Sequence, residues 1–519
     1  FSPEINQFKR NRFNPGALPQ NFVINDGGDA RIDTRSSIGY INENTLSYAK
    51  EIGSDHKLNL LGGFTLQTFQ VEGSVSQAFQ LSNDVTGYNN LAFGSNPNRN
   101  VVGSDYNAFQ LVSWLGRANY IFQNKYLFTF VGRVDGSSRF APGNKYGFFP
   151  SGAVAWRLSE EPFIQDLGLF ESLKLRASYG VSGSQAIDSY RTLAILENSN
   201  TTFNGSEQAG VTLGRPANPD LKWETTRQLD MGLEASFLAG RISFELGYYF
   251  KRTEDLLLNV QIPRQTGFVS RLQNLGEMQN TGLELIFNSV NISKDDFRWS
   301  STLTLSGNRN QVLDLGGVDL IDIVDPSATG QGGPGGRLIV GETSPVFVGV
   351  NYLGTWKTQE EIDASGQLGQ DVGGPRFEDI NDDAQITEDD FIILGSPQPD
   401  FIYGLQNGFS YKNWNLDFFI QGTYGNDVFN SLTQTAFFGR AERTKYAETL
   451  NRWSPENPDS DIPRAGAVAA LSEVKNNSEL IEDATHLRLK NVRLSYNLPV
   501  SNWGLNAFDR ISVYFTANN

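Results

Sequence analysis

The sequence contains no cysteine and only two histidines among its 519 residues. The missing cysteine excludes disulfide frameworks, thiolate metal centres and cysteine nucleophiles. No run of 18 consecutive apolar residues occurs, so a transmembrane helix is not expected. Positive charge is also scarce, because 42 lysines and arginines stand against 58 aspartates and glutamates, and the formal net charge is −16. That balance argues against a nucleic-acid backbone as a partner, and no nucleic-acid binding is predicted.

Aromatic residues and glycine are plentiful instead, with 36 Phe, 18 Tyr, 8 Trp and 52 Gly. Aromatic side chains favour strands, and glycine favours bends and turns. In the segment 112–122, Trp114 and Tyr120 occupy even positions, whereas Arg117 and Asn119 occupy odd positions. Such alternation predicts a strand with one apolar face and one polar face.

The same pattern recurs along the chain and predicts fourteen strands. They lie at 36–50, 56–70, 109–122, 126–134, 149–158, 173–180, 225–238, 241–252, 281–290, 297–308, 402–411, 414–424, 485–498 and 509–517. A tilted membrane strand needs about 9–11 residues, whereas the usual globular strand has about 5–6. Most of the predicted strands meet the longer requirement.

The connections between these strands alternate in length. Short links are expected at 51–55, 123–125, 159–172, 239–240, 291–296, 412–413 and 499–508. Long polar links are expected at 71–108, 135–148, 181–224, 253–280, 309–401 and 425–484. A large soluble β protein also alternates apolar and polar faces, but it has no reason to alternate its links. The sequence therefore favours an all-β transmembrane antiparallel β-barrel, in which the two ends of each strand face different compartments.

Several segments closely resemble one family of membrane proteins and occur in the same order as in that family, over residues 133–498. They are RVDGSSRF at 133–140, GFFPS at 147–151, AWR at 155–157, NPDLKWETT at 218–226, YYFKRTEDLL at 248–257, NTGLE at 280–284, TQEEID at 358–363 and LRLKNV at 487–492. The family is the SusC/RagA group of TonB-dependent outer-membrane transporters of Bacteroidetes-type bacteria.

This resemblance implies a 22-stranded barrel around a globular plug, with long extracellular loops and short periplasmic turns. The fourteen predicted strands then correspond to strands 8 to 21, so that residues 1–519 form the C-terminal part of the barrel. Residues 1–35 look like loop and show neither a plug domain nor a TonB box. The closing strand, expected soon after Asn518, is also missing. We therefore expect the chain to begin and end inside a larger outer-membrane protein.

The resemblance also implies a function and partners. The expected function is active import of a large nutrient, an oligosaccharide or a peptide, across the cell outer membrane. TonB would supply the energy through the plug, a SusD-like surface lipoprotein would close the extracellular mouth, and outer-membrane lipid would surround the barrel. Two alternatives stay open, a scaffold barrel within an outer-membrane lipoprotein assembly and a passive porin. No nucleophile–base motif stands out, so no enzyme is predicted.

The sharpest local chemistry lies at 379–390, inside the longest expected outer link, 309–401. Oxygen-bearing groups recur there at the positions that an EF-hand calcium loop uses. The predicted Ca²⁺ ligands are Asp379, Asn381, Asp383, Gln385 through its carbonyl, Thr387 and Asp390. Ala384 stands where glycine normally makes the sharp turn, and Asp390 is one methylene shorter than the usual glutamate. The sequence predicts a structural Ca²⁺ that braces the link, and the alternative is a solvated acidic loop.

Other features carry weaker functional signals. The string GQGGPG at 330–335 satisfies G-x-G-x-x-G, but no clear strand precedes it, and a flexible loop is the better interpretation. His56 and His486 both begin predicted strands, and without cysteine or a third histidine they are expected to be structural.

Four arginines on the predicted polar faces are expected to pair with carboxylates of the plug or of neighbouring strands: Arg117, Arg133, Arg176 and Arg227. Aromatic residues in the long links can stack on sugars, and the candidates are Phe203, Phe268, Trp356, Phe437 and Phe438. Every long link carries such residues, so the sequence singles out no substrate-contacting residue.

Overall fold

The computed structural model describes residues 1–16, 28–96, 99–203, 205–323, 336–430, 432–433, 446–466, 476–499 and 510–519. Within these residues, the main antiparallel sheet has fifteen strands, which are hydrogen-bonded in their order along the chain. The strands are β1 (Ser2–Asn14), β2 (Gly28–Ile52), β3 (His56–Leu81), β4 (Val101–Phe122), β5 (Tyr126–Ser137), β6 (Tyr146–Arg157), β7 (Phe170–Ser184), β10 (Glu224–Phe237), β11 (Ile242–Glu254), β14 (Glu277–Lys294), β15 (Phe297–Asp314), β22 (Phe401–Tyr411), β23 (Trp414–Tyr424), β26 (His486–Leu498) and β27 (Ile511–Asn518). All fourteen predicted strands are present, and the all-β fold class is confirmed.

The fifteenth strand is β1, and β2 begins at Gly28, so the expectation of loop for residues 1–35 is wrong for 2–14 and for 28–35. β1 pairs along its whole length with β2, from Ser2 opposite Ile41 to Asn14 opposite Asp29. Its sequence, SPEINQFKRNRFN, is rich in charge and lacks a clean period of two. The backbone ladder to β2 therefore holds this strand in place, and the sequence pattern alone could not reveal it.

The strands of the first hairpins are longer than a membrane crossing needs. β2 has 25 residues and β3 has 26. At about 3.3 Å per residue each strand extends roughly 80 Å, whereas the hydrocarbon core of a bilayer is about 30 Å thick. These hairpins therefore project well beyond the membrane on one side.

The link lengths follow the predicted alternation with one exception. The turns at 53–55, 123–125 and 412–413 are tight, and the links at 185–223, 255–276, 315–400 and 425–485 are long. The expected long link 135–148 is shorter in the structure, because β5 and β6 extend into it and leave only 138–145. The next link, 158–169, is the longer of the two because it contains η3 (Leu158–Glu160) and α2 (Pro162–Gln165).

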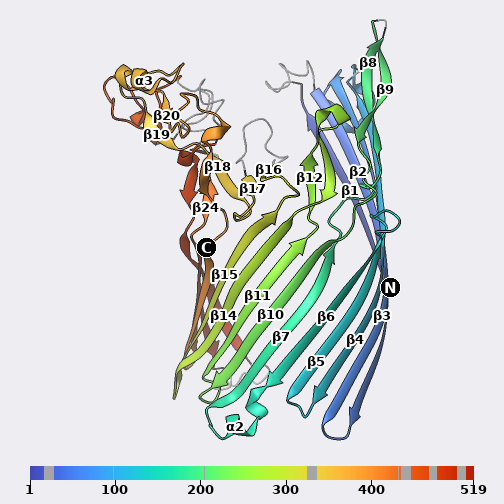
Figure 1. Ribbon diagram of the computed structural model, residues 1–519, viewed down its shortest axis with the longest axis vertical. Helices are drawn as coiled ribbons and strands as arrows, with labels where there is room; N and C mark the ends of the chain where they lie inside the picture. Colours follow the sequence, from blue (N-terminus) through green and yellow to red (C-terminus); the bar gives the residue numbers. More distant parts are fainter. Residues whose placement is uncertain are drawn as a thin grey trace. The chain divides into compact units, whose positions relative to one another are not determined.

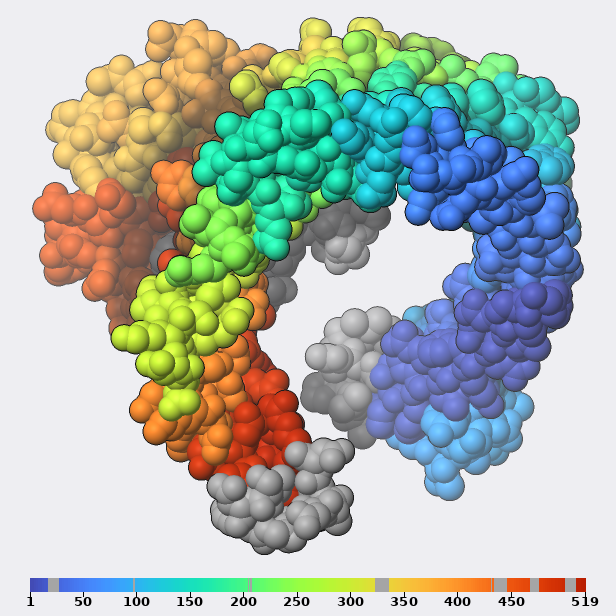
Figure 2. All heavy atoms as spheres, turned by 90° about the horizontal axis from the view of Figure 1, so that it is seen from below, coloured from blue at the N-terminus to red at the C-terminus, as the bar shows by residue number. Residues whose placement is uncertain are grey.

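The chain divides into two compact units, and unit 1 contains Phe1–Val154, Gly180–Thr226 and Asp255–Asn274. The blue and cyan strands of this unit form one curved layer in Figures 1 and 2. Its smaller elements are η1 (Gly87–Asn89), η2 (Leu91–Phe93), β8 (Ile195–Phe203), β9 (Ser206–Arg215), β12 (Leu257–Gln261), η4 (Arg264–Thr266) and β13 (Ser270–Asn274). β8–β9 and β12–β13 are separate two-stranded hairpins in two of the long links.

The outer links of unit 1 have a small dry core of their own. Phe140, Leu221 and Trp223 pack together with Phe149, and Leu221 is fully buried. The Trp223 ring lies 5.3 Å from that of Phe140 and 5.4 Å from that of Phe149, between ring centroids. The Phe149 ring covers the glycine at position 147, where a Cβ would clash with it, so the GFFPS segment needs glycine there. This cluster fixes the links on the end of the strands.

Unit 2 contains Ala155–Tyr179, Arg227–Glu254 and Leu275–Asn519. Its smaller elements, besides η3 and α2, are β16 (Leu320–Ile323), β17 (Gly336–Ile339), β18 (Val346–Gly349), β19 (Tyr352–Thr355), α3 (Gln359–Ser365), β20 (Pro375–Phe377), η5 (Glu388–Asp390), β21 (Ile392–Gly395), β24 (Asp427–Phe429), η6 (Ala447–Asn451), η8 (Ser478–Leu480) and β25 (Ile481–Asp483). These elements form a module in the long links, with α3, β19 and β20 side by side in Figure 1. The fully buried Val350 and Leu480 pack with Phe377 at its centre.

One face of the main strands is apolar and exposed. Phe130 is 61% exposed, Leu283 is 52% exposed and Trp114 is 44% exposed. A face of large apolar side chains on so many strands needs a lipid cover, as in a membrane barrel. Among the described residues, no helix combines the length and the apolar character needed to cross a bilayer.

Aromatic rings also gather at the tight-turn end of the strands. In unit 1, the Tyr120 and Phe128 rings stack with centroids 6.2 Å apart, and Phe122 and Tyr126 do the same at 6.2 Å. In unit 2, the Trp299 and Phe409 rings stack at 5.6 Å beside another tight turn. Girdles of this kind mark the interface between lipid and water in membrane barrels.

Candidate functional site

The polar face of the unit 1 strands carries arginines that are paired within their own strand. Arg133 Nε lies 2.8 Å from Asp135 Oδ1, and its Nη2 also donates to the Ser113 hydroxyl at 3.2 Å. Arg31 Nη2 lies 2.6 Å from Asp33 Oδ1 on β2. Residues i and i+2 of a strand share one face, so each carboxylate meets its arginine without any help from the loops.

The polar face of unit 2 carries a cross-strand version of the same arrangement. Arg176 on β7 lies 3.3 Å from Glu234 on β10 and 2.7 Å from Glu245 on β11. Arg227 pairs with Glu254. Three of the four arginines predicted on the polar faces are thus ion-paired with strand carboxylates. The fourth, Arg117, has no ion-pair partner in the described part of the chain.

The acidic loop at 379–390 is held by hydrogen bonds from its own backbone. Asp379 accepts bonds from the backbone N–H groups of Asp383 (3.2 Å) and Ala384 (2.7 Å). The fully buried Asp390 accepts from the N–H groups of Ile380 (2.9 Å) and Thr387 (2.8 Å). The carboxylates of the first and last predicted ligands are therefore bonded to the backbone of the loop.

The backbone of this loop turns sharply at the position that the sequence marked as irregular. Ala384 adopts φ +63°, in the left-handed region where glycine is usual. The Asp383 carboxylate accepts from Gln385 N at 2.8 Å, and Asn381 Oδ1 accepts from Asp383 N at 3.1 Å. Within the described residues, no group of three or more His, Cys, Asp and Glu side chains is arranged to hold a metal. The Ca²⁺ site therefore stays a prediction.

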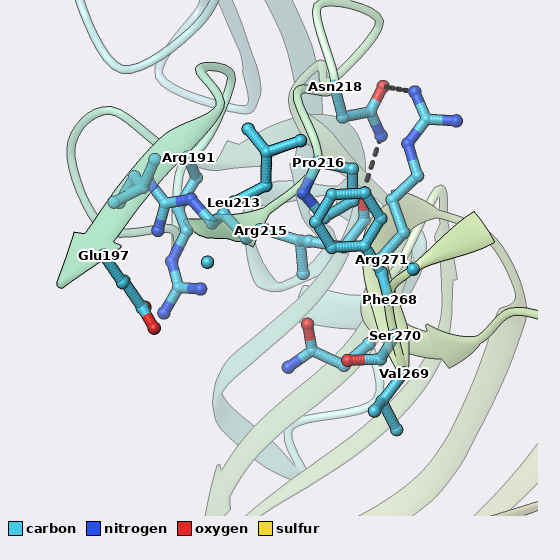
Figure 3. A pocket seen from close by; sticks show the side chains of 15 residues that line it. Arg191, Glu197, Leu213, Arg215, Pro216, Asn218, Phe268, Val269, Ser270 and Arg271 are labelled. Atoms are coloured by element: carbon cyan, nitrogen blue, oxygen red, sulfur yellow. Dashed lines mark hydrogen bonds between the residues drawn. The ribbon is translucent and has the colours of Figure 1, made fainter. Parts of the chain in front are cut away.

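A cavity of about 560 Å³ lies between the two link hairpins of unit 1 (Figure 3). β8 and β9 supply one wall, and β12 and β13 supply the other. Three arginines line it, Arg191, Arg215 and Arg271, and Glu197 is the one carboxylate among the lining side chains. Figure 3 shows Arg191 and Arg215 near Glu197 on one side, and Arg271 on the other. We call this cavity the arginine pocket.

Hydrogen bonds tie the two walls of the arginine pocket together. The buried Asn218 donates from Nδ2 to the Leu272 carbonyl at 2.6 Å, and its Oδ1 accepts a bond from Arg271 Nη2 at 3.0 Å. Lys222 N donates to Asn274 Oδ1, and Asn274 Nδ2 donates back to the Lys222 carbonyl, both at 2.9 Å. These bonds join the segment after β9 to β13, so the pocket is formed before any ligand enters.

The three pocket arginines differ in how their charge is neutralised. Arg191 Nη2 lies 2.8 Å from Asp188 Oδ2. Arg215 donates to two backbone carbonyls, at 2.6 and 3.4 Å, and Arg271 donates to an amide oxygen. Within the described residues, neither Arg215 nor Arg271 has a carboxylate at ion-pair distance. Partial burial, together with the like charge of Arg191, lowers the pKa of Arg215.

A second cavity, of about 690 Å³ in unit 2, is rich in amide side chains. Those amides are occupied in holding the link 315–400. Asn310 Nδ2 donates to the Ser344 carbonyl at 3.0 Å, and Gln398 Nε2 donates to the same carbonyl at 3.2 Å. Gln311 Nε2 donates to the Gly341 carbonyl at 2.9 Å. This cavity is therefore an anchor for the link and offers a ligand few free polar groups.

A third cavity, of about 550 Å³ in unit 2, is acidic and is lined by Glu448, Glu479 and Glu482. Partial burial, together with the nearby carboxylates of Asp461 and Glu482, raises the pKa of Glu479. Asn430 Nδ2 donates to Glu482 at 2.6 Å. The charge in this cavity is opposite in sign to that of the arginine pocket.

The remaining sequence predictions have mixed outcomes. His56 Nδ1 bonds with the Tyr120 hydroxyl at 2.7 Å and His486 Nδ1 with the Thr423 hydroxyl at 3.1 Å, which are structural contacts. Among the link aromatics, Trp356 is only 2% exposed and cannot meet a substrate. Phe203 is 75% exposed at a hairpin tip, and Phe268 lines the arginine pocket. Phe437, Phe438 and the glycine string 330–335 lie outside the described residues.

Sequence reasoning missed the arginine pocket. Arg191 and Arg215 belong to the link 181–224, and Arg271 belongs to the link 253–280. Three arginines in links of a strongly acidic chain were a visible signal, but nothing in the sequence showed that the two hairpins pack against each other.

The family model described as TonB dependent receptor-like, beta-barrel matches residues 6–519. The chain belongs to this family. It is an outer-membrane β-barrel chain, as the sequence predicted. TonB-dependent receptor P26 of Formosa agariphila is 51% identical over 520 residues, which cover 100% of this chain and 52% of the relative. TonB-dependent receptor SusC of Bacteroides thetaiotaomicron is 29% identical over 419 residues, 79% of this chain and 40% of the relative.

Among solved structures, the RagAB peptide importer in its closed-closed state matches this TonB-dependent receptor barrel with a TM-score of 0.81 at 25% identity. The match covers 100% of this chain and 55% of that chain. The predicted resemblance to the SusC/RagA group is therefore confirmed. The chain spans about half the length of the curated relatives it matches.

Proposed function

We propose that this chain is the barrel part of an active importer that takes up a large nutrient, an oligosaccharide or a peptide, through the outer membrane. The observation that carries the proposal is the likeness over the whole chain to the RagAB peptide importer, joined to 29% identity with SusC. A wide barrel with a polar inner face encloses space for a plug or for cargo, not a packed core. No catalytic role is part of the proposal.

TonB and a SusD-like surface lipoprotein complete the proposed system. TonB would act on a plug inside the barrel and so supply the energy for passage. The lipoprotein would close over the long links. In each unit these links are ordered by a small buried hydrophobic cluster. A passive porin has no need of such a closure, and a scaffold has no need of an open path through the barrel.

The decisive experiment is deletion of the gene for the whole protein in its natural host. The strain is then grown on defined oligosaccharides, on peptides and on the corresponding monomers as sole carbon source. Import predicts that growth on one polymer class is lost while growth on its monomer is kept, and that loss of TonB has the same effect. Uptake that survives loss of TonB would identify a porin. Unchanged growth on every polymer, with surface lipoproteins lost, would identify a scaffold.

We also propose that the loop 379–390 binds a structural Ca²⁺. Its predicted ligands present only oxygen donors, which suit a hard cation, and its first and last carboxylates already bond to the loop backbone. The ion would brace the link 315–400 and take no part in transport chemistry.

A further inference from the structure

We infer that the arginine pocket binds the carboxylate or sulfate group of an anionic oligosaccharide. This inference rests on the proposed import function and names the chemical class of its cargo. The ligand group is an oxyanion, because Arg215 and Arg271 line one cavity from different walls, and neither has a carboxylate at ion-pair distance among the described residues. Guanidinium groups bind such oxyanions through paired, charge-assisted hydrogen bonds.

The charge of the pocket stands out against the rest of the chain. Three arginines face one glutamate among its lining side chains, whereas the chain as a whole carries a net charge of −16. Glu197 and Asp188 offset part of this positive charge, and Asp188 is committed to Arg191. An incoming anion would give Arg215 a partner of opposite charge, and it would also offset the like charge of the neighbouring Arg191.

The guanidinium groups of the arginine pocket are also ordered before a ligand binds. Arg215 is fixed by two backbone carbonyls, and Arg271 is fixed by the buried Asn218. The Nε atom of Arg271 is buried and has no hydrogen-bond partner among the residues that the structure describes. Groups that are ordered before binding lose little side-chain entropy when the ligand arrives. The hairpins therefore present a rigid anion site, in contrast to flexible surface arginines.

The other lining groups suit a sugar better than a peptide. Phe268 and Pro216 offer flat apolar surfaces beside the arginines in Figure 3, and the C–H face of a sugar ring can pack on such surfaces. The side chains of Asn259 and Ser270 have no hydrogen-bond partner in the described part of the chain. Amide and hydroxyl groups can both donate to and accept from sugar hydroxyls. A volume of about 560 Å³ suits one or two rings of a longer chain, not a whole polymer.

The test is calorimetric titration of the purified full-length protein with four probes. These are a galacturonic-acid tetrasaccharide, its fully methyl-esterified neutral form, a sulfated galactose tetrasaccharide and tetraglutamate. At least one of the two charged sugars is expected to bind, and the ester is expected to bind at least tenfold more weakly than the acid if the acid is the ligand. Each of Arg215→Gln and Arg271→Gln is expected to weaken the charged sugar about tenfold, the cost of one charge-assisted hydrogen bond.

The matched control is Arg241→Gln. Arg241 also donates to backbone carbonyls, those of Val290 and Asn291 at 3.1–3.3 Å, but it lies at a tight turn and outside the pocket. Its substitution is expected to leave binding unchanged. Arg215→Lys keeps the charge but loses the planar fork, so a smaller loss than with glutamine is expected.

The inference is overturned if the ester binds as tightly as the acid and no sulfated sugar binds, if tetraglutamate binds as tightly as the sugars, or if no probe binds. The same holds if both glutamine variants bind like the wild type. None of these results touches the proposed import function, which the growth experiment tests separately. Loss of growth on a neutral polymer, with no binding in the pocket, would keep the importer and remove the anionic cargo.

Discussion

Arg133 on a main strand and Arg215 in the arginine pocket meet different partners. Arg133 finds Asp135 two residues away on the same strand face, at 2.8 Å. Within the described residues, Arg215, in a link, donates to two backbone carbonyls and to no carboxylate. A strand can place a counter-charge on the same face as its arginine, because its side chains alternate between the two faces with a period of two residues. Arg215 has no such counter-charge at ion-pair distance among the described residues, and the Tyr190 and Leu193 carbonyls hold its guanidinium group instead.

The strands and the links also differ in what stabilises them. The strands form continuous backbone ladders and expose an apolar face to lipid, whereas the links depend on small buried clusters. A substitution in one region is therefore expected to leave the other region unchanged.

The largest effect is expected from Trp223→Ala. This side chain is 8% exposed, packs between Phe140 and Phe149, and donates from Nε1 to the Lys145 carbonyl at 3.0 Å. Removing a buried tryptophan costs about 3–5 kcal/mol. We expect the unit 1 links to become sensitive to protease while the strands stay protected, as measured by limited proteolysis of the protein in its membrane.

Leu196→Ala is the control for this prediction, because Leu196 lies on β8 and is 66% exposed. It should leave the protease pattern unchanged. If Trp223→Ala instead made the strands as sensitive to protease as the links, the two regions would not be stabilised separately. The proposed difference between strands and links would then be wrong.

A smaller effect is expected from Asp379→Ala in the acidic loop. The change leaves the Ala384 N–H group without its acceptor, whereas the Asp383 N–H group keeps Asn381 Oδ1 at 3.1 Å. It also removes the first predicted Ca²⁺ ligand. An N–H group that loses its acceptor costs about 1–3 kcal/mol of folding free energy where water cannot replace that acceptor. We expect loss of protein-bound calcium and faster cleavage within 379–390. Asp389→Asn, an exposed neighbour that is not a predicted ligand, should change neither, and unchanged calcium content in Asp379→Ala would refute the site.

The strands and the links also differ in how far the sequence predicts them. Alternation located fourteen of the fifteen strands of the main sheet, because a strand in a membrane must keep one face apolar. It missed β1, because this strand lacks a clear alternation and is held by backbone hydrogen bonds to β2. The Ca²⁺ loop around Asp379 could be predicted because an EF-hand-like loop is local in sequence, and it stays a prediction. The pocket of Arg191, Arg215 and Arg271 was not, because it forms only when hairpins from two links meet.

A pH effect is expected in the acidic cavity of unit 2. The pKa of Glu479 is raised in the folded protein by partial burial and by the carboxylates of Asp461 and Glu482. A raised carboxyl pKa means that the stability from this group is fully present below the ordinary value of 4.5 and is lost as the pH rises through the raised value. We therefore expect hydrogen exchange around 478–483 to be slower near pH 5 than near pH 8, after correction for intrinsic rates.

Glu479→Gln should remove this difference and slow exchange near pH 8, because glutamine carries no charge to bury. Glu448→Gln, in the same cavity, does not take away the groups that act on Glu479 and should leave the difference in place. A wild-type segment that exchanged faster near pH 5 would show the opposite sign and refute the prediction.

The smallest effect is expected from Arg133→Gln on the main strand β5. The Arg133 side chain is 44% exposed, so solvent screens its pair with Asp135, and glutamine can still donate to that carboxylate. A loss of at most about 1 kcal/mol in unfolding free energy is expected, the usual range for exposed pairs. Binding of the charged tetrasaccharide that the arginine pocket takes should not change, whereas Arg215→Gln should weaken it about tenfold. If both variants weakened binding equally, the ion-paired Arg133 of a main strand and the link arginine Arg215 would bind the anion alike. The distinction between strand and link arginines would then be wrong.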